Sequence, residues 1–102
     1  MKSVLFVFSV LFLISCGETK KNTNADGTPN GEVIYQQNCA ICHGADGKLG
    51  ASGALDLSKS TIGLEERKQI IAKGKGAMTP FESQLSREQV HAVAVFIESL
   101  RK

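Results

Sequence analysis

The sequence is short of the residues with which a small domain usually builds its interior. It has no Trp and one Tyr among 102 residues, and beyond the first fourteen positions the aromatic residues are only Tyr35, Phe81 and Phe96. A chain of this length forms one small domain, which buries a thin core. The scarcity of large side chains suggests that something other than protein fills part of the interior, and a flat apolar cofactor would do so.

The sequence also lacks a dominant charge. Twelve Lys and Arg face ten Asp and Glu, which leaves a formal net charge of +2. No basic patch stands out along the chain, so we expect no nucleic acid among its partners.

No apolar run is long enough for a comfortable membrane span. The longest covers residues 4–14 behind a single Lys, and this length is typical of a signal peptide. It ends in Leu-Ile-Ser-Cys, which resembles a bacterial lipobox, where cleavage precedes the Cys and lipid is attached to its sulfur. We therefore expect residues 1–15 to be a lipoprotein signal peptide and Cys16 to carry the lipid on the periplasmic side of a bacterial membrane. The alternatives are an ordinary secretory leader with a chance Cys, or an uncleaved anchor.

A polar segment separates this leader from the domain. Residues 17–30, GETKKNTNADGTPN, have almost no apolar side chain and cannot bury enough surface to offset the entropy lost on ordering. We expect residues 16–30 to comprise the lipidated Cys and a flexible linker, and residues 31–102 to form the domain.

The domain sequence predicts an all-α fold. Helical spacing of apolar residues predicts helices over about 31–40, 64–73 and 87–100. Ser86 and Gln89 form a predicted capping box at the start of the last helix. No stretch alternates convincingly enough to be a strand. Between the first two helices lies a long Gly- and Ser-rich loop, and such a loop is expected only where it has a task such as wrapping a cofactor.

The most informative motif is Cys39-Ala40-Ile41-Cys42-His43. Two Cys three residues apart lie about one helical turn from each other, so their sulfurs can add to the two vinyl groups on one edge of a porphyrin. His43 follows at once and can bind the iron from one face. In an exported protein this motif is specific for covalent haem attachment.

Other uses of a CxxC pair remain open from the residues alone. A thioredoxin-like redox motif would need a surrounding βαβ pattern, which is missing here. A zinc site would need further ligands, and the only other His is His91. A plain disulfide between Cys39 and Cys42 is the third alternative.

Met78 is the candidate sixth ligand of the iron, since it is the only Met beyond the leader. It lies in Gly-Lys-Gly-Ala-Met-Thr-Pro-Phe, where glycines permit a tight backbone and Pro80 restricts it. The alternative is a Met that fills the core. His91 falls within the last helix with no special approach to the iron, and we expect it to be solvent-facing or partly packed.

These motifs resemble class I, single-haem cytochromes c, and the resemblance covers residues 31 to 101. It is carried by Cys-Ala-Ile-Cys-His-Gly at 39–44, by Met-Thr-Pro-Phe at 78–81, and by paired terminal helices. In that family a Gly and an aromatic residue on the first helix cross the last helix, and Gly31, Tyr35, Val93 and Phe96 match these positions.

The resemblance implies a small cytochrome c fold of three to four helices around one covalent haem c. It implies thioether bonds to Cys39 and Cys42 and axial ligation by His43 and Met78. One departure is the absence of the family's usual Pro after the haem motif. Leu55 stands about where it is expected, and its carbonyl can still accept a hydrogen bond from the histidine. A smaller departure is Thr79, where many relatives have Pro.

The implied function is a one-electron shuttle between respiratory redox partners, such as a quinol-oxidising complex and a terminal oxidase or reductase, and no enzymatic activity. Lys48, Lys73 and Lys75 would border the haem edge and orient acidic partners, or would be ordinary solvated charges.

Two other functions would each be recognised by a different observation. A small haem enzyme or gas sensor, peroxidase-like, would need a displaceable Met78, and rapid carbon monoxide binding would reveal it. A non-haem lipoprotein with a structural role would keep its fold and colour without Cys39 and Cys42.

Overall fold

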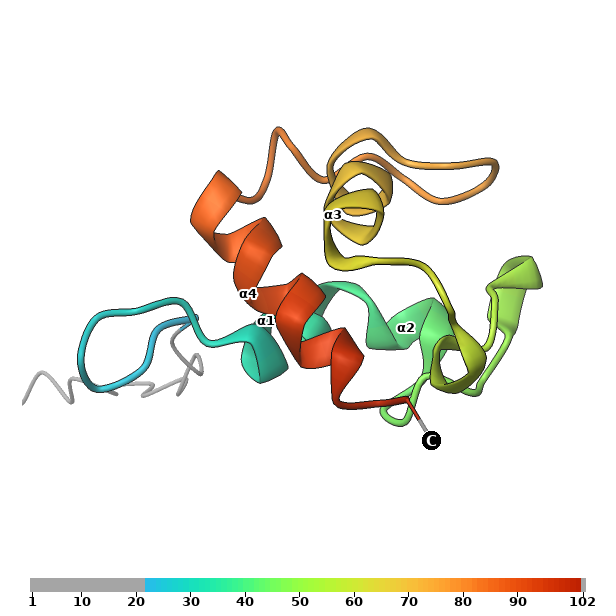
Figure 1. Cartoon of the computed structure of the whole chain (residues 1–102), viewed down its shortest axis with the longest axis horizontal. Coiled ribbons are helices and arrows are strands. Elements are labelled where there is room, and N and C mark those ends of the chain that lie inside the picture. Colours follow the sequence, from blue (N-terminus) through green and yellow to red (C-terminus); the bar gives the residue numbers. More distant parts are fainter. Residues whose placement is uncertain (1–21, 102) are drawn as a thin grey trace, which may run out of the picture.

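The computed structural model describes residues 22–101, and these form a mainly helical domain (Figure 1). The elements in chain order are α1 (Gly31–Asn38), α2 (Ala40–His43), the 3-10 turns η1 (Ala51–Gly53) and η2 (Leu57–Lys59), α3 (Leu64–Lys73) and α4 (Arg87–Glu98). Within the described residues there are isolated β-bridges but no strand, so the all-α prediction is confirmed. The predicted leader and Cys16 lie outside the described residues.

The last helix follows its sequence signals closely. The Ser86 hydroxyl accepts a hydrogen bond from the Gln89 amide at 3.1 Å, and the Gln89 side chain accepts one from the Ser86 amide at 2.8 Å. This reciprocal capping box was predicted and begins α4. The helix ends at Glu98, two residues before the predicted boundary. Its buried face consists of Val90, Val93, Ala94 and Ile97.

The first predicted helix is divided in two. Helix α1 ends at Asn38 and α2 begins at Ala40, with Cys39 between them at φ −109° and ψ −34°. The Asn38 side chain donates to the Ile34 carbonyl at 2.9 Å, and the Cys39 amide donates to the Tyr35 carbonyl at 2.8 Å. These bonds close α1, and α2 then forms a separate short turn that ends at His43.

Helices α1 and α4 cross closely, as the family resemblance implied. The rings of Tyr35 and Phe96 pack at a centroid distance of 5.2 Å. At the crossing, a Cβ atom on Gly31 would overlap the Ala92 backbone carbonyl and lie 3.1 Å from the Phe96 Cβ. Only glycine lets the two helices approach this far.

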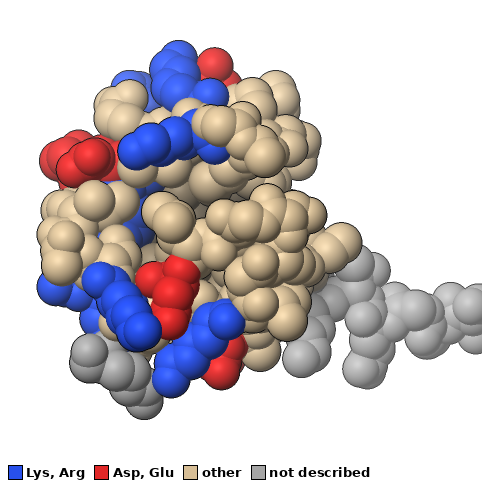
Figure 2. Space-filling model, turned by 90° about the vertical axis from the view of Figure 1, so that its right-hand side faces the viewer, with Lys and Arg blue, Asp and Glu red and all other residues tan. Residues whose placement is uncertain are grey.

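The two long loops reach the same side of the molecule. The segment between α2 and α3 and the segment between α3 and α4 both extend to the right in Figure 1. Figure 2 looks at that side and shows mainly uncharged residues, with Lys, Arg, Asp and Glu toward its margins. This side of the domain carries the site described below.

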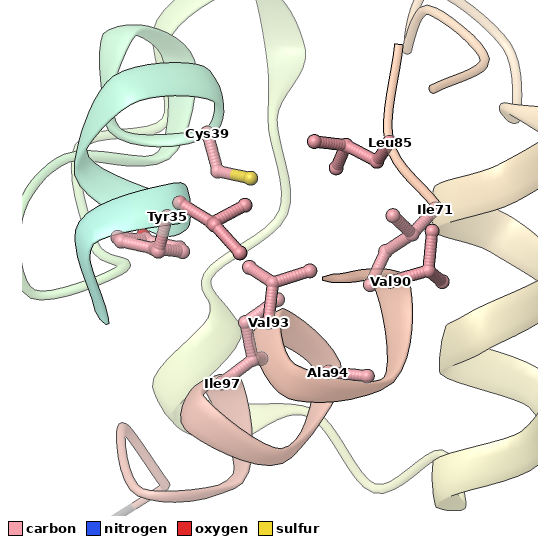
Figure 3. Packing of buried hydrophobic residues seen from close by; sticks show 9 residues of the cluster. Tyr35, Cys39, Ile71, Leu85, Val90, Val93, Ala94 and Ile97 are labelled. Carbon is pink, nitrogen blue, oxygen red and sulfur yellow. The ribbon is translucent and has the colours of Figure 1, made fainter. Parts of the chain in front are cut away.

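A small cluster of buried side chains joins α1, α3 and α4 (Figure 3). Its members are Ile34, Tyr35, Cys39, Ile71, Leu85, Val90, Val93, Ala94 and Ile97. The cluster holds a single aromatic ring, in keeping with the few aromatic residues of the sequence.

Residues 22–30 form a hydrogen-bonded turn that composition did not predict. The Asn24 amide donates to the Thr28 carbonyl at 2.7 Å, and the Asn30 amide donates to the Asn22 carbonyl at 2.7 Å. Asn30 also caps α1, because its side chain accepts from the Val33 amide at 3.1 Å. Asn, Asp, Gly and Pro favour such turns, so a segment predicted to be a flexible linker can still be structured where it joins the domain.

No helix within residues 22–101 is long and apolar enough to cross a membrane.

Candidate functional site

A single large pocket collects the residues that the sequence singled out. It has a volume of about 730 Å³, which lies in the range of cofactor and ligand sites. Cys39, Cys42, His43 and Met78 all line it. Apolar side chains make up much of the remaining wall, among them Ile41, Leu55, Leu57, Ile62, Ile70 and Phe81. Two segments of the chain that lie 35 residues apart therefore meet at one cavity.

The two cysteines present their sulfurs differently. Cys39 is 6% exposed and belongs to the core, whereas Cys42 is partly exposed one helical turn later. Burial raises the pKa of the Cys39 thiol to about 11, because the low-dielectric surroundings disfavour the thiolate. Both thiols are free in the structure.

His43 is oriented by the loop that follows it. Its Nδ1 lies 3.1 Å from the Leu55 carbonyl oxygen. When Nδ1 donates to that oxygen, Nε2 carries the lone pair and is available to a metal. The prediction that a Leu55 carbonyl can replace that of the family's usual Pro is confirmed. The Leu55 side chain is 76% exposed, so its backbone alone fulfils this role.

Met78 is held in a tight loop. Its amide donates to the Lys75 carbonyl at 3.0 Å, and Phe81 ties the end of the loop to the Ile71 carbonyl at 3.0 Å. Gly74 begins the loop at φ +76°, and a Cβ there would lie 2.6 Å from the Met78 carbonyl oxygen. The loop therefore requires glycine at position 74 to bring Met78 to the pocket.

Of the other residues that the sequence singled out, some line the pocket and some do not. His91 is exposed on α4 and lies outside this pocket, as expected. Of the three lysines considered, only Lys75 lines the pocket. Lys73 is paired with Glu82 at 2.7 Å, and Lys48 does not line it.

Two cationic residues of the pocket were missed from sequence. Lys59 lines it from the turn before α3, and no local signal marks this residue. Arg67 lines it from α3 and is buried. The signal for Arg67 was available, because it shares a helical face with Ile70 and Ile71.

The described residues provide no ligand set for a zinc site, the alternative considered above. Across residues 22–101, no three His, Cys, Asp or Glu side chains gather as a group that could hold a metal ion.

Comparison with known proteins places the chain in a family. A family model described as "Cytochrome C oxidase, cbb3-type, subunit III" matches residues 26–97. A cytochrome c6-like protein of Nostoc sp. PCC 7120 is 33% identical in an alignment 103 positions long, and the match covers 95% of this chain and 88% of that protein. The chain belongs to the class I cytochrome c family. Cytochrome c6 of Leptolyngbya boryana is 35% identical over 79 residues, covering 72% of this chain and 91% of the relative.

Solved structures agree with this assignment. The c-type cytochrome KustC0563 has a TM-score of 0.66 and 27% identity, and the match covers 72% of this chain and 99% of that structure. The small cytochrome c fold predicted from sequence is thereby confirmed. As a single-haem cytochrome c, the chain carries a covalent haem c and is an electron carrier rather than an enzyme.

The residues of the pocket fit this cofactor. A thiol pair, an imidazole with a free nitrogen and a thioether line a largely apolar cavity, and these are the donors that haem c takes.

Proposed function

We propose that this cytochrome holds its haem through thioether bonds to Cys39 and Cys42, with His43 Nε2 and Met78 Sδ as the axial ligands of the iron. The observation that carries the proposal is that all four side chains line one pocket, where Leu55 already orients His43. When bound, haem c supplies a reversible one-electron change at its iron, between the ferric and ferrous states.

The surrounding residues contribute orientation and exclusion of water. The Leu55 carbonyl fixes the imidazole plane and its tautomer. The loop from Gly74 holds Met78 in place, and a thioether ligand favours the reduced iron relative to harder ligands. Haem seated against the apolar wall would exclude water from this part of the pocket. Because hydrogen bonds to backbone carbonyls hold both Met78 and His43, little rearrangement of these residues would accompany electron transfer.

The proposal extends to location and partners. Cys16 follows a signal-like apolar run in a lipobox-like sequence, which supports a lipid anchor on the periplasmic side of a bacterial membrane. There the cytochrome would pass electrons between respiratory proteins, such as a quinol-oxidising complex and a terminal oxidase or reductase. Lys59 and Lys75 line the pocket and would orient acidic partner surfaces.

The decisive experiment uses the haem-loaded protein from a host that attaches haem c. Intact mass should show one added haem, and the ferric protein should show the absorption band of iron–thioether ligation. Met78→Ala should keep the haem, abolish that band, lower the midpoint potential and open the ferrous iron to carbon monoxide. His91→Ala is the matched control and should change none of these.

Two results would contradict the assignment. One is a ferric wild-type spectrum without the thioether band, which would exclude Met78 as a ligand. The other is rapid carbon monoxide binding by the ferrous wild type, which would favour a haem enzyme or gas sensor with a displaceable Met78.

A further inference from the structure

Arg67 is a buried charge in the wall of the pocket. Arg67 is 4% exposed and lines the cavity from α3, one helical turn before Ile71. A guanidinium keeps its charge in any protein, so its burial is tolerated only where acceptors surround it.

Most of the guanidinium is satisfied by the protein. Nη1 donates to the Ala94 carbonyl at 3.2 Å and lies 2.9 Å from a Glu98 carboxylate oxygen, while Nη2 donates to the Ile62 carbonyl at 3.2 Å. Arg67 therefore joins α3 to α4 and to the segment before α3. Glu98 is shared, because the exposed Arg101 lies 2.6 Å from its other oxygen.

One nitrogen atom of the guanidinium group makes no hydrogen bond at all among the described residues. In the part of the chain that the structure describes, Arg67 Nε is buried and has no hydrogen-bond partner. Buried polar groups nearly always have an acceptor, and an unpaired donor on a charged group is especially costly. Since Arg67 also lines the pocket, an acceptor group on the molecule that the pocket holds would satisfy this nitrogen. Haem offers a matching group, because its two propionates are carboxylates at one edge of an otherwise apolar ring.

We propose that Arg67 is a positioning residue whose Nε donates a hydrogen bond to a haem propionate. This inference rests on the proposed haem site. It assigns Arg67 two effects: its Nε would position a haem propionate, and its guanidinium would place a positive charge beside the haem. A nearby cation favours the ferrous form, which carries one positive charge fewer than the ferric form, and so raises the midpoint potential.

The test compares Arg67→Gln with Arg101→Gln in the haem-loaded protein. Both variants remove one cation that pairs with Glu98, but only Arg67 lines the pocket. We expect Arg67→Gln to keep the covalent haem and to shift the one-electron equilibrium about tenfold toward the ferric form, a midpoint potential about 59 mV lower. Arg101→Gln should change the midpoint potential by only a small fraction of that shift.

A second measurement does not depend on a buried substitution. In nuclear magnetic resonance spectra of the reduced wild type, the Arg67 Nε proton should exchange slowly with water and show through-space contacts to propionate methylene protons. Arg67→Lys keeps the positive charge but lacks the planar set of donors. This variant should lose the contacts to the propionate and keep a midpoint potential close to that of the wild type.

The outcomes separate this inference from the proposed function. A wild type without covalent haem contradicts the haem site itself. A haem-loaded protein in which the two glutamine variants shift the potential equally, or in which the Nε proton contacts only water, overturns the role of Arg67 and leaves the haem site standing.

Discussion

At the scale of single residues, Tyr35 links the helix crossing to the haem motif. The residue is fully buried, its ring packs on Phe96, and its hydroxyl donates to the Gly44 carbonyl at 2.6 Å. Gly44 directly follows His43, so the bond holds the end of the motif against α1. Burial raises the pKa of the Tyr35 hydroxyl to about 12, because the apolar surroundings disfavour the phenolate.

The first prediction concerns this hydroxyl. Tyr35→Phe should lower the free energy of unfolding by about 1–2 kcal/mol at pH 7, because the partly buried Gly44 carbonyl loses a donor. Since folding raises the pKa, the neutral form is favoured in the folded state. The contribution is therefore complete below about pH 10 and is lost as pH rises toward 12. Urea unfolding of both proteins at pH 7 and above pH 10 checks this. A difference that is absent at pH 7, or that does not shrink above pH 10, would contradict it.

At the scale of elements, the close crossing of α1 and α4 depends on Gly31. A Cβ at this position would lie 2.7 Å from the Ala92 carbonyl carbon. Backbone cannot move aside as a flexible side chain can, so the helices themselves would have to separate.

The second prediction follows from this geometry. Gly31→Ala should destabilise the folded protein by about 1–3 kcal/mol, the usual cost of overpacking. Gly63→Ala is the matched control, because Gly63 has an ordinary φ of −75° and a Cβ there would have no atom within 4 Å. Thermal unfolding should show a clearly larger decrease of the midpoint for Gly31→Ala than for Gly63→Ala, which loses only the advantage of Gly over Ala at the N-cap of α3. Equal midpoints for the two variants would mean that the crossing is not tightly packed.

At the scale of the whole molecule, the protein core is incomplete without its cofactor. The buried cluster comprises nine side chains, and the pocket beside it has a volume of about 730 Å³. A domain of this size buries little apolar surface of its own. Haem in the pocket would therefore complete the core as well as carry the electron.

The third prediction separates haem attachment from membrane attachment. A chain with both Cys39→Ser and Cys42→Ser should lack haem and lose most of its helical circular dichroism, because the cofactor replaces much of the core. Cys16→Ser should keep haem and fold but move from the detergent phase to the aqueous phase on partition. A double variant that melts like the haem-loaded protein would show that the polypeptide folds without its cofactor.

Much of the fold and of the site was predictable because the signals are local. The helical spacing of apolar residues, the Ser86 capping box and the CxxCH motif each depend on residues within a few turns of one another. Boundaries were less predictable. The break at Cys39 and the turn at residues 22–30 arise from particular side-chain and backbone hydrogen bonds that periodicity does not encode.

The amino-acid order was thus sufficient to indicate a helical haem protein and to name its four candidate haem-binding residues. The folded structure was needed to show that the Leu55 carbonyl reaches His43 and that Lys59 lines the pocket. It was also needed to show that Arg67 is buried and that its Nε has no partner within residues 22–101. These features depend on contacts between residues far apart in sequence, such as Arg67 and Ala94. Such pairs leave no local pattern, because only the folded backbone brings them within hydrogen-bonding distance.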